Sequence, residues 1–328
     1  MDECVSYFVN YNSSAILPIE YASLKVASED CLIYLIDNGS ADGSDVALAE
    51  FLKSLGANFV FLRLPRNLGF SRAVNYAFRK FKSHYRYFVL LNNDLVPVKG
   101  VLAKLVDVLE SGGYAGVQGT IMQMLRPDLV DNAGHIVDRF GLAYPVCRGF
   151  TFSCARDYCP SYLSGAFSIY RADVIKRLGA PFSDFYEAYL DDKLLGARLR
   201  HMGHKLFHKA LVAGFHLGSA TYGPRRVFKS PRWFKYVAIA ELAPVASNAP
   251  AGLRLLAYLK FLASGVLASV FTGEDYVKPL VEVYKSLIKG MPELDLVKSS
   301  LFDLKSFLVQ NPVKGIAAPS MDRTCGYM

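Results

Sequence analysis

The chain has 328 residues, of which 52% are hydrophobic, and it carries a formal net charge of +8 with a sequence pI of about 9.0. This length accommodates one large α/β domain with a smaller appended region, and the 22 phenylalanines and 20 tyrosines support a well-filled core. The basic balance suits anionic partners such as nucleotide diphosphates or anionic lipid headgroups. Nucleic acid is the least favoured anionic partner, because the basic residues are not interleaved with aromatic ones on one expected surface.

The first residues argue against a secretory signal peptide, because Met1-Asp2-Glu3-Cys4 is acidic where such a signal is basic. We therefore expect a cytoplasmic protein, with any membrane contact being peripheral and at the inner face of the cell membrane. The six cysteines contain no C-x-x-C pair, which argues against a zinc or redox centre and favours reduced thiols. The alternative is a disulfide between Cys154 and Cys159.

Four short apolar strands alternate with amphipathic helical segments in the first third of the chain. The expected strands are 4–10, 31–36, 58–62 and 87–91, and the expected helices are 15–27, 42–55 and 71–81. This order predicts an α/β fold with a Rossmann-like, mostly parallel sheet flanked by helices. Ligands of such sheets bind beyond the carboxyl ends of the strands.

Polar residues follow each of the four expected strands. The clusters are Asn10-Tyr11-Asn12-Ser13, Asp37-Asn38-Gly39-Ser40, Pro65-Arg66-Asn67-Leu68-Gly69 and Asn92-Asn93-Asp94. Because the carboxyl ends of parallel strands share one edge of a sheet, we expect these clusters to form a single binding site.

The segment 37–44 follows a buried strand and opens a helix. A carboxylate at this position, Asp37, is able to accept hydrogen bonds from a nucleobase imide or a ribose hydroxyl, and the glycines permit close backbone approach. The alternative is that Asp42 or Ser40 simply caps the next helix.

The segment 67–75 enters a second helix, with Arg66 and Arg72 close to its start. The free N–H groups of a helix start, together with these cations, are suited to an anion such as phosphate. The alternative is that Ser71 is an ordinary helix N-cap.

Asp94, at the end of the fourth strand, is the candidate metal ligand. Mg²⁺ and Mn²⁺ prefer oxygen ligands and are commonly held by one or two carboxylates plus phosphate and water. Such an ion would neutralise charge on a departing nucleoside diphosphate. The alternative is a turn with an Asx cap.

The middle of the chain, roughly 116–221, has a less regular pattern. The segment 131–135 is typical of a turn, 164–170 and 205–213 of strands, and 189–202 of a helix. Neighbouring helix residues point about 100° apart, so Asp191 and Asp192 cannot both face one atom. We expect one of them to face the cleft and the other to cap the helix or to pair with Arg198 or Arg200.

An apolar segment at 253–271 follows a basic cluster that consists of Arg225, Arg226, Lys229, Arg232 and Lys235. Its uncharged part, 261–271, is too short to span a bilayer, which needs about 20 residues. Two interpretations stay open: an interfacial membrane anchor, or a helical hairpin packed against the rest of the chain or another subunit.

In their order and spacing, the motifs between residues 5 and 221 resemble the family 2 glycosyltransferases with a GT-A fold, and within them the rhamnosyltransferase-like branch. The stretch 36–44 resembles the nucleoside-binding signature, 67–75 the following helix motif, and Asn92-Asn93-Asp94 the D-x-D-type metal motif in its N-N-D form. The resemblance implies a divalent cation, Mg²⁺ or Mn²⁺, at Asp94 and His216. It also implies a nucleotide-sugar site formed by Asn10, Asn12, Asp37, Asn38, Gly39, Asn67, Gly69, Arg72, Asn75, Asn92 and Asn93.

The stretch 190–204 resembles the family pattern F-E-D-x-D-L-x-x-R-x-x-x-x-G-[YH]. Its catalytic acidic pair falls on Asp191 and Asp192, and the resemblance makes Asp192 the general base. Two residues depart from the pattern, because Asp191 replaces the usual Glu and Leu194 replaces the second Asp, which removes a carboxylate. Further candidates, for an acceptor site, are Tyr186, Glu187, Tyr189 and Trp233.

The resemblance implies an inverting, metal-dependent glycosyltransferase of the hexosyl-transferring class. Such an enzyme moves a sugar from a nucleotide diphosphate sugar to a hydroxyl acceptor, here in cell-surface or lipid-linked glycan synthesis. We expect a GT-A catalytic domain over 1–225, with a nucleotide-sugar half (1–115) and an acceptor half (116–225), and a helical C-terminal region over 226–328.

Two other functions stay open at this point. One is a non-catalytic, membrane-associated binding protein with a degenerate transferase fold, which the single metal carboxylate and Leu194 would favour. The other is a sugar-phosphate nucleotidyltransferase, which would need a Gly-rich loop with Arg and Lys where this chain has Asn10-Tyr11-Asn12-Ser13-Ser14.

Overall fold

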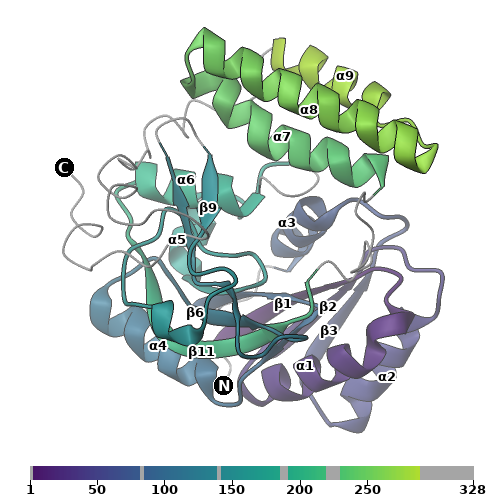
Figure 1. Cartoon of the computed structure of the whole chain (residues 1–328). Helices are drawn as coiled ribbons and strands as arrows, with labels where there is room; N and C mark the ends of the chain where they lie inside the picture. The colour runs from purple at the N-terminus through teal and green to yellow at the C-terminus, as the bar shows by residue number, and fades with distance from the viewer. Residues whose placement is uncertain (1–2, 82–84, 139–141, 185–190, 219–229, 289–328) are drawn as a thin grey trace.

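A nine-stranded sheet forms the centre of the residues that the computed structural model describes, which are 3–81, 85–138, 142–184, 191–218 and 230–288 (Figure 1). The strand order is β3-β2-β1-β4-β10-β6-β11-β5, and β7 pairs with β6 off this path. Strands β8 and β9 form a separate two-stranded sheet.

The first four strands are parallel, and the α/β fold expected from the sequence is confirmed. The strands are β1 (Cys4–Asn10), β2 (Leu32–Asp37), β3 (Phe59–Arg63) and β4 (Tyr87–Asn92), and the helices between them are α1 (Leu17–Asp30), α2 (Ser44–Ser54) and α3 (Phe70–Lys80). A short 3-10 turn, η1 (Ser14–Ile16), precedes α1. Since Asn10 pairs with Asp37 in the register of β1 and β2, the polar clusters after these strands share one edge of the sheet.

The second half of the sheet mixes strand directions. Its elements are β5 (Leu95–Pro97), α4 (Val101–Gly112), β6 (Gly116–Gln123), β7 (Val130–Asn132), β8 (His135–Val137), β9 (Ala143–Pro145), η2 (Phe152–Cys154), β10 (Phe167–Arg171), α5 (Ala172–Arg177), α6 (Asp191–His201) and β11 (Leu206–His216). Strand β10 runs antiparallel to β4 and β6, so its beginning lies beside the end of β4. There the Asn92 N–H donates to the Ala166 carbonyl at 2.9 Å. The turn expected at 131–135 was only partly right, because β7 and β8 occupy most of it.

Helices cover both faces of the sheet. Helices α1, α2 and α4 pack on one face through residues such as Leu24, Leu48 and Leu105, all fully buried. Helices α3, α5 and α6 pack on the other through residues such as Val74 and Leu195. In Figure 1 the first set lies below the sheet and the second set above it. Between these two layers lies the edge of the sheet at which the parallel strands end, and polar side chains occupy it.

Three C-terminal helices form a further layer over α3 and α6: α7 (Pro231–Asn248), α8 (Ala251–Thr272) and α9 (Val277–Ile288) (Figure 1). They share a small core that includes Phe234, Phe261 and Tyr276. Helix α7 reaches the sheet domain, since Ile239 and Ala240 pack against α6. The helical C-terminal part expected from the sequence is therefore present; the expected boundary after residue 225 lies outside the described residues.

Helix α8 has 22 residues, a mean hydropathy of 1.7 over its most apolar window, and 17% of that window buried. By length and composition it is the one helix in the described part of the chain that could cross a membrane, which by itself is weak evidence. Its buried side, which includes Phe261 and Ala268, packs on α7 and α9. The opposite side exposes large apolar residues, including Leu256, Val270 and Phe271.

The expectation of reduced cysteines was wrong for the described residues. Cys4 pairs with Cys31 across the parallel strands β1 and β2, where their Cα atoms are 4.7 Å apart. Cys147 pairs with Cys154, with Cα atoms 5.8 Å apart, so the alternative pairing of Cys154 with Cys159 is also wrong. The η2 turn brings Cys154 back toward Cys147, which spacing alone did not indicate.

Candidate functional site

A buried hydrogen-bond network lies beneath the carboxyl ends of β1 and β2. The Asn10 Nδ2 group donates to Asp37 Oδ1 and to Ser44 Oγ, both at 3.0 Å. The Asp37 carboxylate also accepts from the Ser40 N–H at 3.1 Å and from the Ser40 hydroxyl. Because Asn10 and Asp37 are both fully buried, their side chains fix the shape of the loop between β2 and α2 rather than line the surface.

Two asparagines connect this network to the neighbouring loops. Asn12, which is exposed and has a φ of 45°, accepts from the Ala41 N–H at 2.8 Å. The Asn38 Oδ1 accepts from the Leu68 N–H at 2.9 Å, and its Nδ2 donates to Asn67 Oδ1 at 3.1 Å. The loops after β1, β2 and β3 are thus joined side by side, as the sequence predicts for a shared site.

Two predicted glycines serve backbone geometry. Gly39 has a φ of +81°, and a Cβ on it would lie 2.6 Å from the Arg66 Cα atom, so no other residue fits there without a shift of the main chain. Gly69 has a φ of +85°, precedes α3, and donates its N–H to Asn67 Oδ1 at 2.8 Å. Both glycines therefore hold backbone close to the strand ends.

Arg72 and Asn75, predicted on the donor side, bind another segment of the chain. The Arg72 Nε group donates to the Asp184 carbonyl at 2.8 Å. The buried Asn75 amide donates to the Phe182 carbonyl at 2.8 Å and accepts from the Phe182 N–H at 3.0 Å. In this structure both residues fasten the segment 182–184 to α3.

The Asn92-Asn93-Asp94 turn carries two separate contacts. The Asn93 Nδ2 group donates to Glu20 Oε1 on α1 at 2.9 Å. Asp94 Oδ1 lies 3.0 Å from His216 Nε2, and His216 Nδ1 lies 2.8 Å from Asp131 Oδ2. His216, at the end of β11, therefore bridges two carboxylates that are far apart in the sequence.

The electrostatics of this histidine follow from the two carboxylates. Burial by itself would lower its pKa, but the hydrogen bonds with Asp131 and Asp94 raise the pKa of His216 to about 10. The imidazole is therefore protonated at neutral pH, and a divalent ion bound at Asp94 would take the place of its Nε2 proton.

The donor set at Asp94 fits a divalent cation in part. A carboxylate oxygen and an imidazole nitrogen converge there, and Mn²⁺ accepts both types of ligand. Among the residues that the structure describes, no group of three or more His, Cys, Asp or Glu is arranged to hold a metal. Asp94 and His216 would thus supply two ligands, and diphosphate oxygens and water would complete the shell.

Asp191 and Asp192, at the start of α6, make different contacts, as expected for adjacent helix residues. Asp191 Oδ2 accepts from Ser71 Oγ on α3 at 3.0 Å. Asp192 accepts from the Gly165 N–H at 3.3 Å and from the Lys193 N–H at 2.8 Å. Burial and the neighbouring Asp191 raise the pKa of Asp192 to about 7. Asp192 is therefore a carboxyl group that exchanges its proton near neutral pH.

Pairing of either aspartate with Arg198 was a wrong expectation. The Arg198 guanidinium donates to the carbonyls of Leu178, at 2.8 Å, and Ala180, at 3.2 Å, after α5. Lys193 is the basic residue next to the pair; it is buried, and burial lowers its pKa to about 8. Its Nζ group contacts the Ala240 carbonyl of α7 at 3.4 Å.

Leu194, which replaces a family aspartate, has a structural explanation. Its side chain is 1% exposed and packs with Ala197 against Ile239 and Ala240 of α7. An unpaired carboxylate at this position would be buried between two helices, which is unfavourable. The apolar residue therefore follows from the helical layer that covers α6.

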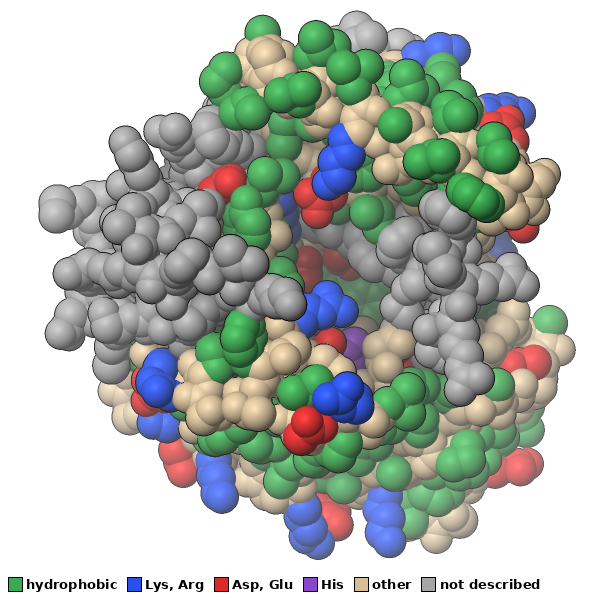
Figure 2. All heavy atoms as spheres, in the orientation of Figure 1, with side chains coloured by type: hydrophobic (Ala, Val, Ile, Leu, Met, Phe, Trp, Pro, Cys, Tyr) green, Lys and Arg blue, Asp and Glu red, His purple; other side chains and the backbone are tan. Residues whose placement is uncertain are grey.

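Most of the predicted residues gather at one edge of the sheet. Asp192 contacts Gly165, the next residue Ala166 bonds to Asn92, and the Asn92-Asn93-Asp94 turn reaches His216. Figure 2 shows a hollow on this face, between the helical layer above and the sheet below, in which acidic side chains and a histidine gather. The edge thus combines a carboxyl group that titrates near neutral pH with a candidate cation site.

Sequence reasoning missed several partners at this edge. The sequence places Asp131 in an expected turn and singles out neither Glu20 nor Gly165. Asp131 contacts a residue 85 positions away and Glu20 one 73 positions away. Each lies outside any local motif, and no pattern in the expected helix 15–27 marks Glu20 as buried.

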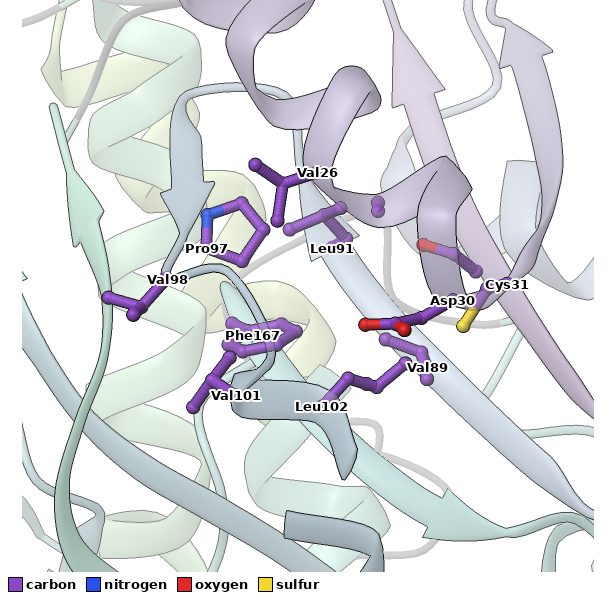
Figure 3. Close-up of a pocket in the computed structure, with 12 residues that line it drawn as sticks. Val26, Asp30, Cys31, Val89, Leu91, Pro97, Val98, Val101, Leu102 and Phe167 are labelled. Atoms are coloured by element: carbon purple, nitrogen blue, oxygen red, sulfur yellow. The ribbon is translucent and has the colours of Figure 1, made fainter. Parts of the chain in front are cut away.

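An apolar crevice lies on the other helical face, between α1, α4 and the sheet (Figure 3). Its walls include Val26, Leu91, Val101 and Phe167, and Asp30 is the only charged residue among those that line it. These residues belong mainly to the core under α1 and α4. We therefore regard the crevice as a packing feature, separate from the polar edge.

Some predicted acceptor residues lie outside the described part of the chain. Tyr186, Glu187 and Tyr189 fall in the range 185–190, and the side chain of Trp233 on α7 is likewise not described.

Comparison with known proteins agrees with the geometry. The family model described as glycosyl transferase family 2 matches residues 8–179, just over half of the chain. No curated protein sequence matches the chain significantly.

Solved structures of similar fold come from glycosyltransferases. The mannosyltransferase PcManGT from Pyrobaculum calidifontis, in complex with GDP-Man and Mn²⁺, is 13% identical with a TM-score of 0.50, covering 91% of this chain and 85% of its own. GalNAc-T7 with UDP, GalNAc and Mn²⁺ is 14% identical with a TM-score of 0.55, over 75% of this chain and 52% of that one. S. aureus TarS is 13% identical with a TM-score of 0.52, over 94% and 52%.

At such low identity these neighbours show the fold alone, and this chain spans about half the length of the last two. The family match rests on the sequence itself and covers β1 to α5, the segment that carries the strand-end motifs. The chain belongs to glycosyl transferase family 2.

Proposed function

We propose that this glycosyltransferase inverts the anomeric centre of a nucleotide diphosphate sugar as it transfers the sugar to a hydroxyl acceptor. The observation that carries the proposal is the position of Asp192. Its carboxyl group, with a pKa of about 7, lies beside the start of β10, which borders the end of β4 and the Asn92-Asn93-Asp94 turn. A base with a pKa near the working pH is the most effective one for proton abstraction.

In the proposed reaction, ionised Asp192 takes the proton of the acceptor hydroxyl. The acceptor oxygen then forms a bond to the anomeric carbon while the bond from that carbon to the diphosphate oxygen breaks. Asp191 is held by Ser71 and raises the basicity of Asp192 through its charge. Asp94 and His216 would hold a divalent cation, which when bound offsets the charge of the departing nucleoside diphosphate.

The donor proposal rests on the loops at the sheet edge and on the family. The neighbouring structures contain GDP-Man, UDP or UDP-GlcNAc, so we include donors of both the UDP and the GDP class in the test. The resemblance of Asn92-Asn93-Asp94 to the N-N-D motif of the rhamnosyltransferase-like branch adds a deoxyhexose donor such as dTDP-rhamnose to this proposal. We assign the metal as Mn²⁺ or Mg²⁺.

We further propose that the enzyme works peripherally on a membrane surface, where its acceptor is a lipid-linked or cell-surface glycan. The support is the exposed apolar side of α8, where Leu256 and Leu259 are at least half exposed. Arg254 and Lys260 on the same helix are exposed cations that suit anionic headgroups.

The activity is tested with purified full-length protein, a panel of UDP-, GDP- and dTDP-sugars, a membrane lipid extract and Mn²⁺ or Mg²⁺. Release of nucleoside diphosphate that stops when EDTA is added and resumes with metal would support the proposal. Donor binding without turnover across the panel and acceptor extracts would point instead to a binding protein. Absence of binding to every nucleotide sugar would overturn the proposal.

The stereochemistry has its own test. Proton NMR of the product formed from an α-linked donor should show a β linkage, because a single in-line displacement inverts the anomeric carbon. Retention of the donor configuration would exclude the role given to Asp192.

A further inference from the structure

A buried glutamate on α1 connects two loops at the polar edge of the sheet. Glu20 is fully buried; its Oε1 accepts from the Asn93 Nδ2 group at 2.9 Å and its Oε2 lies 2.7 Å from Ser13 Oγ. Asn93 precedes the candidate metal ligand Asp94, and Ser13 follows β1. One side chain therefore connects the loop after β1 with the turn after β4.

The hydrogens of this network can be counted. The Ser13 hydroxyl lies within hydrogen-bond distance of both Asn10 Oδ1 and Glu20 Oε2, yet it has only one hydrogen to donate. The amide orientation of Asn10 is fixed, because its Nδ2 group donates to Asp37 Oδ1 at 3.0 Å. Asn10 Oδ1 must therefore accept a hydrogen bond from a neighbouring hydroxyl.

The other hydroxyl near Asn10 Oδ1 is used elsewhere. Ser44 Oγ lies 3.5 Å from Asn10 Oδ1 but only 2.6 Å from Asp42 Oδ1, so its hydrogen goes to Asp42. Ser13 then donates to Asn10. The contact between Ser13 and Glu20 needs a second hydrogen, and Glu20 is the group able to supply it.

We infer that Glu20 is a positioning residue which, as a neutral acid, donates a hydrogen bond to Ser13 and accepts one from Asn93. In this way it holds the loop after β1 and the Asn92-Asn93-Asp94 turn in a fixed relative position. The inference deepens the proposed function, because these loops are the donor-binding part of that site. Each buried hydrogen bond in the chain Glu20–Ser13–Asn10 is then satisfied, as buried polar groups normally are.

The environment of Glu20 supports the neutral form. Burial raises its pKa to about 7 against the lowering effect of the bonds from Ser13 and Asn93. Two charged groups that act on it, Asp42 before α2 and Asp94 after β4, both favour protonation. Ionisation would draw the Ser13 hydrogen to Glu20 and leave buried Asn10 Oδ1 without a donor.

The variant Glu20→Gln tests the inference, because the glutamine has the same shape and reproduces the neutral acid. Its Oε1 accepts from Asn93 and its Nε2 donates to Ser13. The exposed Glu50 of α2 offers a matched control as Glu50→Gln, and Glu20→Ala removes both bonds.

Thermal unfolding needs no ligand and tests whether Glu20 is protonated in the folded chain. The folded chain keeps the Glu20 proton up to a pH of about 7, whereas the unfolded chain loses it near 4.5, so the stability of wild type falls between these values as the pH rises. We expect the Tm of Glu20→Gln minus the Tm of wild type to increase by roughly 5 °C from pH 5 to pH 8. The Tm of Glu50→Gln should follow that of wild type over the same range. A Tm difference that does not change with pH would overturn the inference.

Nucleotide binding tests the positioning role of Glu20. Calorimetric titration with UDP, GDP and dTDP in the presence of Mg²⁺ should show that the nucleotide affinity of wild type weakens roughly tenfold more than that of Glu20→Gln between pH 6 and 8. The nucleotide's own titration is common to both proteins and cancels in this comparison. Equal pH profiles of nucleotide affinity for wild type and Glu20→Gln would refute the role. A nucleotide affinity of Glu20→Gln as weak as that of Glu20→Ala would also refute it. If wild type bound none of the three nucleotides, the proposed function would fail while the unfolding data still decided the state of Glu20.

Discussion

His216 lies between two carboxylates, and the second of them, Asp131, sets its orientation. The Asp131 contact at 2.8 Å fixes the Nδ1 side of the ring, so that Nε2 faces Asp94. Residues that orient a metal-ligating histidine typically change metal affinity about 10–100-fold when they are replaced. We predict that Asp131→Asn weakens Mn²⁺ binding by this factor, measured by electron paramagnetic resonance of free Mn²⁺ in the presence of a nucleoside diphosphate. Asp128→Asn, an exposed neighbour, is the control, and an unchanged affinity in Asp131→Asn would contradict the assigned metal site.

The raised pKa of Asp192 predicts how the reaction responds to pH. A general base acts only when it is ionised, so kcat should rise with pH up to about 7 and then level off. Below that pH the rate should fall roughly tenfold per pH unit, because the ionised fraction of Asp192 falls by that factor. Initial rates between pH 5.5 and 8.5 under saturating donor provide the measurement. A flat profile over this range would mean that Asp192 is not the group that accepts the proton.

At the residue scale, the sequence predicted where side chains lie better than which contacts they make. The strand-end motifs identified Asp37, Asn92 and Asp94 as neighbours of one edge, the family resemblance added His216, and the structure brings the four residues there. It did not indicate that Asp37 is fully buried, because its bonds to Asn10 and Ser40 depend on how three loops close over it. Side-chain partners that lie tens of residues apart follow from the tertiary fold and not from a local pattern.

Helix α6 carries the proposed catalytic pair at its start and contacts α7 through its apolar residues. Leu194 and Ala197 form that contact, and Leu194 is 1% exposed. We predict that Leu194→Ala lowers the free energy of unfolding by about 2–5 kcal/mol, because it leaves a cavity between the two helices. Urea denaturation followed by circular dichroism measures the change, with the 67% exposed Leu125→Ala as control. A loss as small as that of the control would show that α7 does not stabilise α6.

At the element scale, the regular periodicity of the first half made β1 to β4 and α1 to α3 predictable. The strands β5, β7, β8 and β9 were missed, since each has only three residues and is defined by its pairing partner. Helix α4 and the eight-residue strand β6 were not predicted either, although neither is short. Antiparallel β10 was expected as a strand, but its direction depends on the long connection before it. The disulfide partners were not predictable for the same reason: they depend on distances across the fold.

At the scale of the whole molecule, α8 exposes a row of large apolar side chains among the residues that the structure describes. Leu256 is 62% exposed and Val270 is 75% exposed. Each such side chain contributes about 1–2 kcal/mol when it enters the acyl boundary of a bilayer. We predict that the double change Leu256→Gln and Val270→Gln weakens binding to vesicles with anionic headgroups at least tenfold.

Co-sedimentation with phosphatidylglycerol vesicles at low and high salt measures this binding. The pair Val46→Gln and Leu125→Gln, which removes exposed apolar side chains far from α8 in the sequence, should bind like wild type. If the α8 variant also binds like wild type, α8 is not the membrane contact. If wild type does not bind at all, the peripheral location would be wrong.

The most direct measurement compares Asp192→Asn with wild type in both turnover and donor binding. The amide keeps the shape of the side chain but cannot take a proton, so kcat should fall by about 10²–10⁴-fold. The dissociation constant of the donor, measured by calorimetry, should stay within about twofold, because the nucleotide loops are untouched. Asp107→Asn, an exposed aspartate of α4, should keep full activity. A fall in kcat with intact donor binding would confirm Asp192 as the base of a glycosyl transfer; wild-type turnover in Asp192→Asn would contradict it.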